Sequence, residues 1–257
     1  MNKYFNFKNV LIIGASRGIG RALSFKFAEL GANLFIAARN EDNLRNIVES
    51  IRSKGGKADY AICDVTIKSD VKNTIQKAND ILGKIDIAII NSGINGSEGF
   101  DNFDSEVFKR IYNVNIYGIL HSLEYLIPIM KQNNSGIIAG VSSLADVYGF
   151  PGSGAYCSSK AAATTILEAV RLELARFNIK VITIKPGFVY TDMTKDIKYP
   201  MPFIIDAEKA SDYIVKGIKK EKNIISFPFM TKMLVGIAKL LPANIMNFVF
   251  KNREFRF

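Results

Sequence analysis

The sequence predicts an α/β protein built on one doubly wound parallel sheet of about seven strands, with helices on both faces. Short apolar runs of strand length alternate along the chain with longer stretches of helical periodicity, as this architecture requires. The runs are apolar at nearly every position, which is typical of strands that are buried on both faces. The length of 257 residues, of which 48% are hydrophobic, fits a single globular domain.

The first half of the chain contains four expected strands, at residues 9–13, 33–37, 59–62 and 85–90. The first helix runs to about Leu30, and Gly31 follows as its C-cap. The next two helices are expected at residues 41–54 and 68–82, and Gly83 closes the second of them. Residues 104–130 form a longer helical stretch, which we expect Pro128 to break near its end.

The second half continues the alternation without an internal repeat or a linker. Strands are expected at residues 136–141, 179–184 and 223–226, and a long helix at about 155–177 lies between the first two. Asp206 has the character of an N-cap for a helix at residues 207–219. We therefore expect one domain and no second folding unit.

A glycine-rich turn follows the first strand and opens the first helix. Its glycines are Gly14, Gly18 and Gly20, in the run Gly-Ala-Ser-Arg-Gly-Ile-Gly. Glycine has no Cβ, so the backbone can approach a phosphate closely, and the free N–H groups of a helix start attract anions. We therefore expect the phosphates of a nucleotide to bind at this turn.

Ser143, Tyr156 and Lys160 form the candidate reactive group. Ser143 comes just after the strand at 136–141, and side chains that do chemistry gather at the carboxyl ends of parallel strands. Tyr156 and Lys160 are four residues apart at the start of a helix, so their side chains share one face. A nearby ammonium favours the phenolate and lowers the pKa of a tyrosine, which suits acid–base work near neutral pH.

Together, the spacing Gly-x-x-x-Gly-x-Gly and the Ser143, Tyr156 and Lys160 set resemble the short-chain dehydrogenase/reductase family over roughly residues 9–193. The resemblance implies a Rossmann-type fold and an NAD(P)-dependent enzyme that moves hydride between its cofactor and a CH–OH or C=O group. It implies that Ser143 hydrogen-bonds the substrate oxygen, Tyr156 donates the proton, and Lys160 stabilises the phenolate and holds the nicotinamide ribose. Asn115 matches the family's asparagine that supports a water relay to the lysine; a buried structural amide is the alternative.

The resemblance also implies a set of cofactor contacts at the strand ends. Asp64 and Val65 would border the adenine, and the Pro-Gly segment that begins at Pro186 would contact the nicotinamide amide. Ile13 and Ile90 replace residues typical of the family, and we expect these changes to affect local hydrogen bonds between strands. The complete expected cofactor set is Gly14, Ser16, Arg17, Gly18, Ile19, Gly20, Arg39, Asp64, Val65, Asn91, Ser92, Gly93, Tyr156, Lys160, Pro186, Gly187, Val189 and Thr191.

We expect the cofactor to be NADP (NADPH). Sites for NAD carry an acid near the end of the second strand, whereas sites for NADP place arginine there for the 2′-phosphate. Here the strand ends in Ala-Ala-Arg39-Asn, and the first carboxylate is Glu41. Arg17 is a second cation near the same point, and the fork of arginine makes two hydrogen bonds to a phosphate. The alternative is that both arginines are solvated surface residues.

Two other functions fit parts of the sequence. A non-catalytic NADP-binding regulator or scaffold would keep the glycine turn, although an intact Ser143, Tyr156 and Lys160 set argues against it. The run from Gly14 to Gly18 also matches the Gly-x-Ser-x-Gly turn of serine hydrolases, which need a histidine base. The single histidine, His121, lies within a helical pattern where packing is its usual role, so a hydrolase is a distant third.

The net charge of +10 comes from lysines that are scattered without an arginine-rich block, so we expect no nucleic-acid partner. Acidic or phosphorylated ligands, or an anionic membrane surface, would be attracted instead. Cys63 and Cys157 lack metal-ligand spacing, which predicts free thiols, no metal and a cytoplasmic location. The first eight residues show no signal-peptide pattern, and no apolar run approaches the ~18 residues of a membrane span.

The tail differs in composition from the rest, so we assign residues 1–226 to the dinucleotide-binding and catalytic domain and residues 227–257 to an apolar, basic, helical extension of that domain. Its apolar stripe comprises Met233, Leu234, Ile237, Leu240 and Leu241, after which Pro242 interrupts. The stripe is expected to pack over the cleft or a partner subunit; peripheral contact with a membrane is the other reading. Both readings favour an apolar carbonyl or alcohol as the small-molecule substrate.

The long helices at residues 104–130 and 155–177 carry broad apolar faces. In related proteins such helices pair across a two-fold axis, which predicts a homodimer. The 3-oxoacyl-carrier-protein reductases of the family usually end in a Val-Asp-Gly-Gly segment. This chain has no match to it, which disfavours that assignment.

Overall fold

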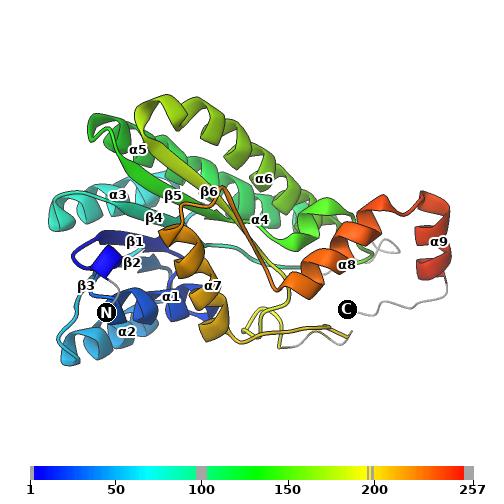
Figure 1. Cartoon of the computed structure of the whole chain (residues 1–257), viewed down its shortest axis with the longest axis horizontal. Helices are drawn as coiled ribbons and strands as arrows, with labels where there is room; N and C mark the ends of the chain where they lie inside the picture. Colours follow the sequence, from blue (N-terminus) through cyan, green and yellow to red (C-terminus); the bar gives the residue numbers. More distant parts are fainter. Residues whose placement is uncertain (1–2, 97–102, 196, 198–199, 252–257) are drawn as a thin grey trace.

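The computed structural model describes residues 3–96, 103–195, 197 and 200–251, and it forms one seven-stranded parallel sheet in the order β3-β2-β1-β4-β5-β6-β7 (Figure 1). Every neighbouring pair of strands runs parallel. The strands are β1 Asn9–Ile13, β2 Asn33–Ala38, β3 Lys57–Ile62, β4 Ile87–Ile90, β5 Gly136–Val141, β6 Ile179–Pro186 and β7 Ile224–Phe227. This confirms the predicted doubly wound α/β class.

Two layers of helices cover the sheet, one on each face (Figure 1). Helices α1, α2 and α7 pack on one face, and α3, α5 and α6 pack on the other. The side chains of β1 alternate between the two layers, because Val10 and Ile12 join the first core while Leu11 and Ile13 join the second. The helices are α1 Gly18–Glu29, α2 Glu41–Ser53, α3 Lys68–Leu82, α4 Ser105–Tyr112, α5 Gly118–Gln132, α6 Gly154–Leu174, α7 Ala207–Lys219, α8 Phe229–Leu240 and α9 Ala243–Lys251.

Local signals in the sequence account for several of these boundaries. The side chain of Asn40 accepts a hydrogen bond from the backbone N–H of Asn43 and caps α2. Asp206 caps α7 in the same way through the N–H of Lys209, as predicted. Gly83 has a φ of 72° after α3, a conformation in which glycine carries no Cβ penalty.

The predicted break at Pro128 is wrong. Pro128 lies inside α5, and the long helical stretch is interrupted earlier, by a π-helical segment at Asn113–Tyr117 between α4 and α5. A proline removes the hydrogen bond to the carbonyl four residues before it, here that of Glu124. Both Pro128 and Glu124 are exposed, so water can satisfy that carbonyl and the helix continues.

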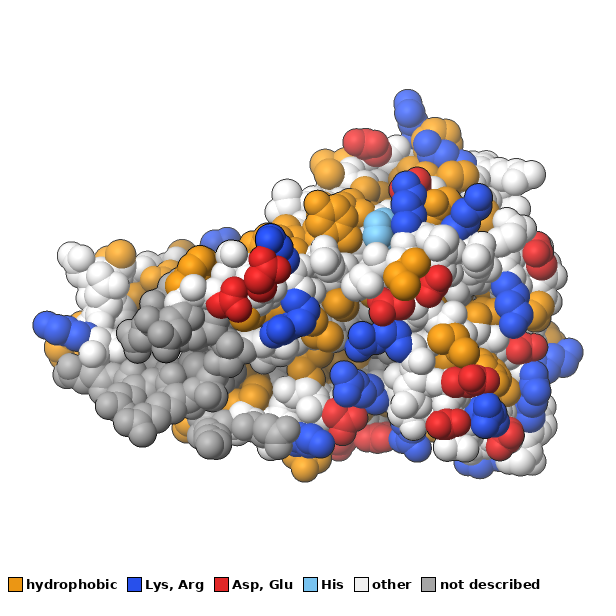
Figure 2. All heavy atoms as spheres, turned by 180° about the vertical axis from the view of Figure 1, so that it is seen from behind, with side chains coloured by type: hydrophobic (Ala, Val, Ile, Leu, Met, Phe, Trp, Pro, Cys, Tyr) orange, Lys and Arg blue, Asp and Glu red, His pale blue; other side chains and the backbone are white. Residues whose placement is uncertain are grey.

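Charge is spread widely over the surface. Figure 2 shows Lys and Arg side chains mixed with acidic and apolar ones across the visible face, and the described residues on that face form no single basic stripe. In the described part of the chain, no single helix is long and apolar enough to cross a membrane. Helices α8 and α9 pass that test of length and composition only together, and they are bent by 113° at their junction.

Candidate active site

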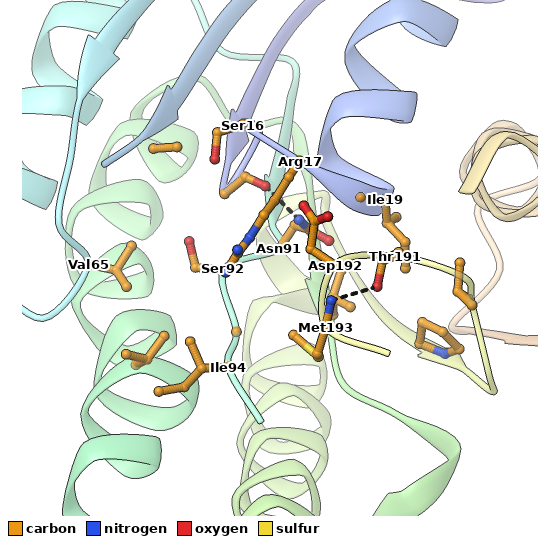
Figure 3. Close-up of a pocket in the computed structure, with 18 of the residues that line it drawn as sticks. Ser16, Arg17, Ile19, Val65, Asn91, Ser92, Ile94, Thr191, Asp192 and Met193 are labelled. Carbon is orange, nitrogen blue, oxygen red and sulfur yellow. Dashed lines mark hydrogen bonds between the residues drawn. The ribbon is translucent and has the colours of Figure 1, made fainter. Parts of the chain in front are cut away.

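A cleft of about 430 Å³ opens at the carboxyl ends of the strands, where the strand order reverses between β1 and β4. Ligands bind at such a point in open α/β sheets. The cleft is lined by the glycine turn, by the segments that follow β2 to β6, and by two residues of α6. Figure 3 shows Val65 and Ile94 on one side of it and Thr191, Asp192 and Met193 on the other.

The glycine turn leaves no space for side chains. Gly14 has a φ of +89°, and a Cβ at that position would lie 2.6 Å from the backbone nitrogen of Ser92. At Gly18 (φ +52°) a Cβ would lie 3.1 Å from Cγ2 of Thr191. Among the described residues no side chain caps the first turn of α1, which also holds no acid, so its N–H groups suit an anion. These features fit a dinucleotide with its diphosphate at this turn.

The turn is held by Asn91. Its side-chain Nδ2 donates to the carbonyl of Gly14 over 2.7 Å, and its backbone nitrogen donates to the carbonyl of Ile13 over 2.9 Å. This contact ties the end of β4 to the turn. The apolar residues Ile13 and Ile90 are fully buried in the core, so they contribute packing at positions where the sequence departs from the family.

Ser143 stands at the end of β5 with its side chain held in place. Its Oγ accepts a hydrogen bond from the backbone nitrogen of Ala145 over 3.1 Å and donates to the carbonyl of Pro186 over 3.4 Å. The second of these bonds is long and therefore weak. Ser143 lines the cleft, so its hydroxyl can turn to a substrate oxygen at little cost.

Lys160 is a buried cation beside Tyr156. Its Nζ lies 5.7 Å from the ring centre of Tyr156 and donates to the carbonyl of Val141 over 3.0 Å. The side chain is 3% exposed, and burial lowers the pKa of Lys160 to about 8. Both residues line the cleft one helical turn apart, as the sequence predicted. A carbonyl oxygen placed here would meet a hydroxyl of Ser143 and a phenol supported by an ammonium.

Asn115 is the one predicted catalytic residue that does not line the cleft. It is fully buried, and its side chain bonds both backbone groups of Ile94: Oδ1 accepts from the nitrogen over 2.8 Å and Nδ2 donates to the oxygen over 3.0 Å. Nδ2 also donates to Oγ of Ser159 over 3.0 Å. The π-helical segment places this residue, and a Cβ on Gly93 would lie within 3.4 Å of both Asn115 Oδ1 and Lys160 Nζ. The side chain therefore positions the cleft wall next to Lys160.

The far end of the cleft, beside the carboxyl end of β2, carries Arg39, and Arg17 lines the cleft from the glycine turn. Arg17 extends from the glycine turn toward Ser92 (Figure 3), and Arg39 lies 3.8 Å from Asp64 with its side chain 64% exposed. Glu41, the first acid after β2, does not line the cleft; it accepts hydrogen bonds from Arg45 and from the hydroxyl of Tyr60. No carboxylate of this segment therefore faces the cleft from the end of β2.

Nearly all the predicted cofactor residues line this cleft, the exception being Gly20, which lies in α1 beneath the turn. The structure adds lining residues that lie outside the predicted cofactor set: Ala38, Asn40, Asn43, Cys63, Ile94, Val114, Val141, Ser142, Asp192, Met193 and Thr194. Each lies within a few residues of a predicted one, so extending the predicted segments at each strand end would have found most of them. Cys63 is buried, which raises the pKa of its thiol to about 11, so it is not a nucleophile at neutral pH.

The positions of Ser16 and His121 exclude the serine-hydrolase hypothesis. Ser16 lines the cleft, but the chain's only histidine, His121, does not. Nδ1 of His121 lies 3.0 Å from the carbonyl of Val65, with which it forms a hydrogen bond on α5. A serine without a histidine base in reach lacks the general base of that mechanism.

Comparisons with known proteins agree with this geometry. The family described as short chain dehydrogenase matches residues 8–201. An uncharacterized oxidoreductase of Myxococcus xanthus is 30% identical over 237 residues, which are 92% of this chain and 94% of that protein. A 7alpha-hydroxysteroid dehydrogenase of Escherichia coli is 32% identical over 193 residues, 75% of each chain, and a 3-oxoacyl-[acyl-carrier-protein] reductase of Thermotoga maritima is 32% identical over 190 residues, 74% of this chain and 77% of that one.

Two solved structures share the fold. A short-chain type dehydrogenase/reductase from Mycobacterium marinum superposes with a TM-score of 0.80 at 28% identity and covers 86% of this chain and 94% of its own. A short chain dehydrogenase/reductase from Burkholderia phymatum in complex with NAD superposes with a TM-score of 0.84 at 21% identity, over 100% of this chain and 99% of that one. The chain therefore belongs to the short-chain dehydrogenase family, oxidoreductases that bind a nicotinamide cofactor and act on CH–OH or C=O groups.

Proposed function

We propose that this protein is an NADPH-dependent reductase of an apolar carbonyl compound, and that it works in the cytoplasm. The observation that carries the proposal is the placement of Ser143, Tyr156 and Lys160 together on the cleft that begins at the glycine turn. A scaffold that only binds the cofactor does not require a buried lysine beside a tyrosine in the cleft. The buried free thiols Cys63 and Cys157 fit a reducing compartment.

The side chains divide the work of carbonyl reduction. The bound nicotinamide supplies the hydride that the carbonyl carbon receives. Negative charge then develops on the substrate oxygen, where the hydroxyls of Ser143 and Tyr156 can both donate hydrogen bonds. Tyr156 gives its proton to that oxygen, and the Lys160 ammonium stabilises the phenolate left behind. Asn115 acts by holding the backbone of Ile94 next to Lys160.

The proposed preference for NADPH is supported by the far end of the cleft. Arg17 and Arg39 line the cleft. Glu41 is the acid that would bind a ribose 2′-hydroxyl, but it accepts hydrogen bonds from Arg45 and Tyr60. Asn40 and Asn43 supply further polar groups at that end. A phosphate that meets a guanidinium group forms charge-assisted hydrogen bonds, which are stronger than neutral ones.

Arg39→Ala should weaken NADPH binding by about ten- to a hundredfold, because a hydrogen bond to a charged group contributes about 1.5–3 kcal/mol. NADH affinity should change by less than about twofold, because NADH has no phosphate at that carbon. Fluorescence titration of both cofactors measures this. Arg21→Ala is the matched control: Arg21 is exposed on α1, does not line the cleft and should leave both affinities as they are. Equal affinities of the wild type for the two cofactors would reject the preference.

The substrate end of the cleft favours an apolar compound. Ile94 and Met193 line it, and Met193 is 38% exposed. Among the aromatic residues that follow Met193 in the chain, Tyr199 lies outside the described residues and Phe203 is exposed. The decisive experiment is a panel of ketones and aldehydes of increasing chain length with NADPH. The proposal requires turnover and a kcat/KM that rises with apolar length; cofactor binding without turnover of any member would favour the scaffold.

We also propose a homodimer that pairs through α5 and α6, which lie side by side on one face of the sheet (Figure 1). Large apolar side chains are exposed near this face: Tyr117 by 51%, Leu120 by 37% and Leu172 by 79%. Light scattering should give the mass of a dimer at micromolar concentration, and Leu172→Glu should shift it toward the monomer because the interface would bury an unpaired carboxylate. Phe7→Glu, at a site 72% exposed near the N-terminus, is the control. A monomeric wild type would refute the pairing.

A further inference from the structure

We infer that the outer face of α8 and α9 docks on a bilayer that contains anionic phospholipid. This deepens the proposed function and rests on it, because the membrane would be the source of the apolar substrate. The docking face is made of nine large apolar side chains, each at least 40% exposed. They are Phe229, Met230, Met233, Leu234, Ile237 and Leu240 of α8 with Ile245, Phe248 and Val249 of α9.

This face is far richer in exposed apolar groups than the rest of the protein. It holds nine of the 23 large hydrophobic side chains that are exposed among the described residues, on two short helices. Leu240 is 84% exposed and Phe248 is 79% exposed. Single exposed apolar residues are ordinary, but a cluster of this kind marks an interaction site.

Helix α8 presents its larger side chains outward. Thr231 is buried, and Val235 and Ala238, which recur at helical spacing from it, are partly buried. The predicted stripe that includes Met233 and Ile237 lies on the opposite, exposed side. Within one chain the stripe therefore does not pack over the cleft, which corrects one of the expected arrangements. The smaller inner side chains attach the helix to the body and leave the larger ones for a partner.

The positive charge of α8 and α9 indicates which partner the docking face binds. Residues 229–251 contain Lys232, Lys239 and Lys251 and no acid, and all three lysines are exposed. A two-fold contact would set this face against a copy of itself, which would bring the lysines beside it near those of the copy, with no carboxylate in residues 229–251 to pair with them. Anionic lipid headgroups supply the missing charge and lie next to an apolar layer.

The helices are suited to lying on a membrane and not to crossing it. Helix α8 has 12 residues and α9 has nine, so each is shorter than the ~20 residues that span a bilayer. The bend of 113° between them prevents a continuous span. Figure 1 shows both helices at one end of the molecule, extending away from the sheet, where a flat surface can reach them.

Helices α8 and α9 contact the cleft wall at one point and the segment that leads to Tyr156 at another. Thr231 of α8 packs on Gly187, where a Cβ would lie 2.9 Å from its Cγ2, and Gly187 lines the cleft. Phe250 of α9 contacts the ring of Phe150 at 6.4 Å between centres, and Phe150 belongs to the segment between Ser143 and Tyr156. A membrane under α8 and α9 would therefore lie beside the cleft.

The test is flotation of the full-length protein with two kinds of vesicle: phosphatidylcholine alone, and phosphatidylcholine with phosphatidylglycerol. We expect binding to the anionic vesicles at low salt, and at least about tenfold weaker binding to the neutral ones, since only the anionic headgroups attract the three lysines. Raising the salt concentration should weaken the anionic binding, because screening shortens the reach of the charges.

Two variants with matched controls test the residues. Leu240→Glu with Phe248→Glu should reduce vesicle binding at least about tenfold, whereas Phe7→Glu, at a residue that is 72% exposed elsewhere on the protein, should not. Changing Lys232, Lys239 and Lys251 to Gln should remove the preference for anionic vesicles, and the same change at the exposed Lys216, Lys220 and Lys222 should not. All variants should bind NADPH as the wild type does, which separates this test from the test of the enzyme.

Three results would overturn the inference. The first is a full-length protein that binds NADPH but floats with neither vesicle. The second is equal binding to both vesicles at all salt concentrations. The third combines two observations: the double variant Leu240→Glu, Phe248→Glu has a smaller mass than the wild type in light scattering, and the wild type binds no vesicles. That outcome would make the face a contact between copies of the chain.

Discussion

Tyr156→Phe should lower kcat for carbonyl reduction by about a hundred- to ten-thousandfold while leaving the fold and NADPH binding intact. The change removes one oxygen atom, the donor of the proton, from a ring that lines the cleft. A positioned general acid contributes about that much to the rate. Because the ring itself is kept, packing in α6 should not change. Single-turnover measurement of NADPH consumption isolates the chemical step from substrate binding and product release, and fluorescence titration reports cofactor binding.

Tyr112→Phe is a matched control for this result. The hydroxyl of Tyr112 in α4 donates to Oγ of Ser158 over 2.8 Å, in the helix α6 that also carries Tyr156, yet Tyr112 does not line the cleft. Tyr112→Phe loses the same hydroxyl outside the cleft, so the variant should retain most of the activity. If Tyr156→Phe reduced carbonyls at the wild-type rate, another group would have to be the acid; if both variants lost activity equally, the effect would be structural.

Much of the fold could be predicted from the sequence because a parallel sheet buries both faces of its strands. Runs such as residues 9–13 and 136–141 are apolar at nearly every position, so their bounds agree with β1 and β5. Pro128 misled the reading, because the effect of a proline depends on whether the freed carbonyl can reach water, and the sequence alone does not show that. The π-helical segment that holds Asn115 has no local signature that we could read.

The site residues could be predicted from the sequence where residues that are close along the chain are also close in the structure. Tyr156 and Lys160 share a helical turn, and the glycines share one loop, so local sequence sufficed. Asn43 and Ile94 reach the cleft only because separate strand ends converge, and this depends on strand order. The sequence also could not show that the α8 stripe is exposed. Periodicity shows that a helix has an apolar face but not what covers that face.

Lys160→Met should lower kcat by about a hundredfold or more, as the phenolate left by proton transfer would lose its stabilising cation. The same variant should gain stability at neutral pH. Lys160 is buried, and none of the ion pairs formed by the described residues includes it. Charging it in the folded state is therefore costly, and methionine has similar length without the charge.

The pH dependence follows from the depressed pKa of Lys160. Between its folded value of about 8 and its ordinary value of 10.5, the unfolded chain holds a proton that the folded chain has lost. The free energy of unfolding of the wild type should therefore rise with pH across that window, by about 3 kcal/mol in all from this group. Below pH 8 the full cost of the buried charge is present in the folded state.

Lys160→Met removes this cost and also removes the hydrogen bond from Nζ to the carbonyl of Val141, which is worth about 1 kcal/mol. The variant should be more stable than the wild type by about 2 kcal/mol at pH 6.5, a rise of about 5 °C in Tm, and less stable by about 1 kcal/mol above pH 10.5, where only the lost hydrogen bond remains. Lys185→Met is the contrasting control: Lys185 is paired with the buried Asp146 at 2.6 Å, so its loss should destabilise the protein. Urea unfolding of all three proteins from pH 6 to 11 measures the effect, and a Lys160→Met variant less stable than the wild type at pH 6.5 would show that the ammonium is not costly where it lies.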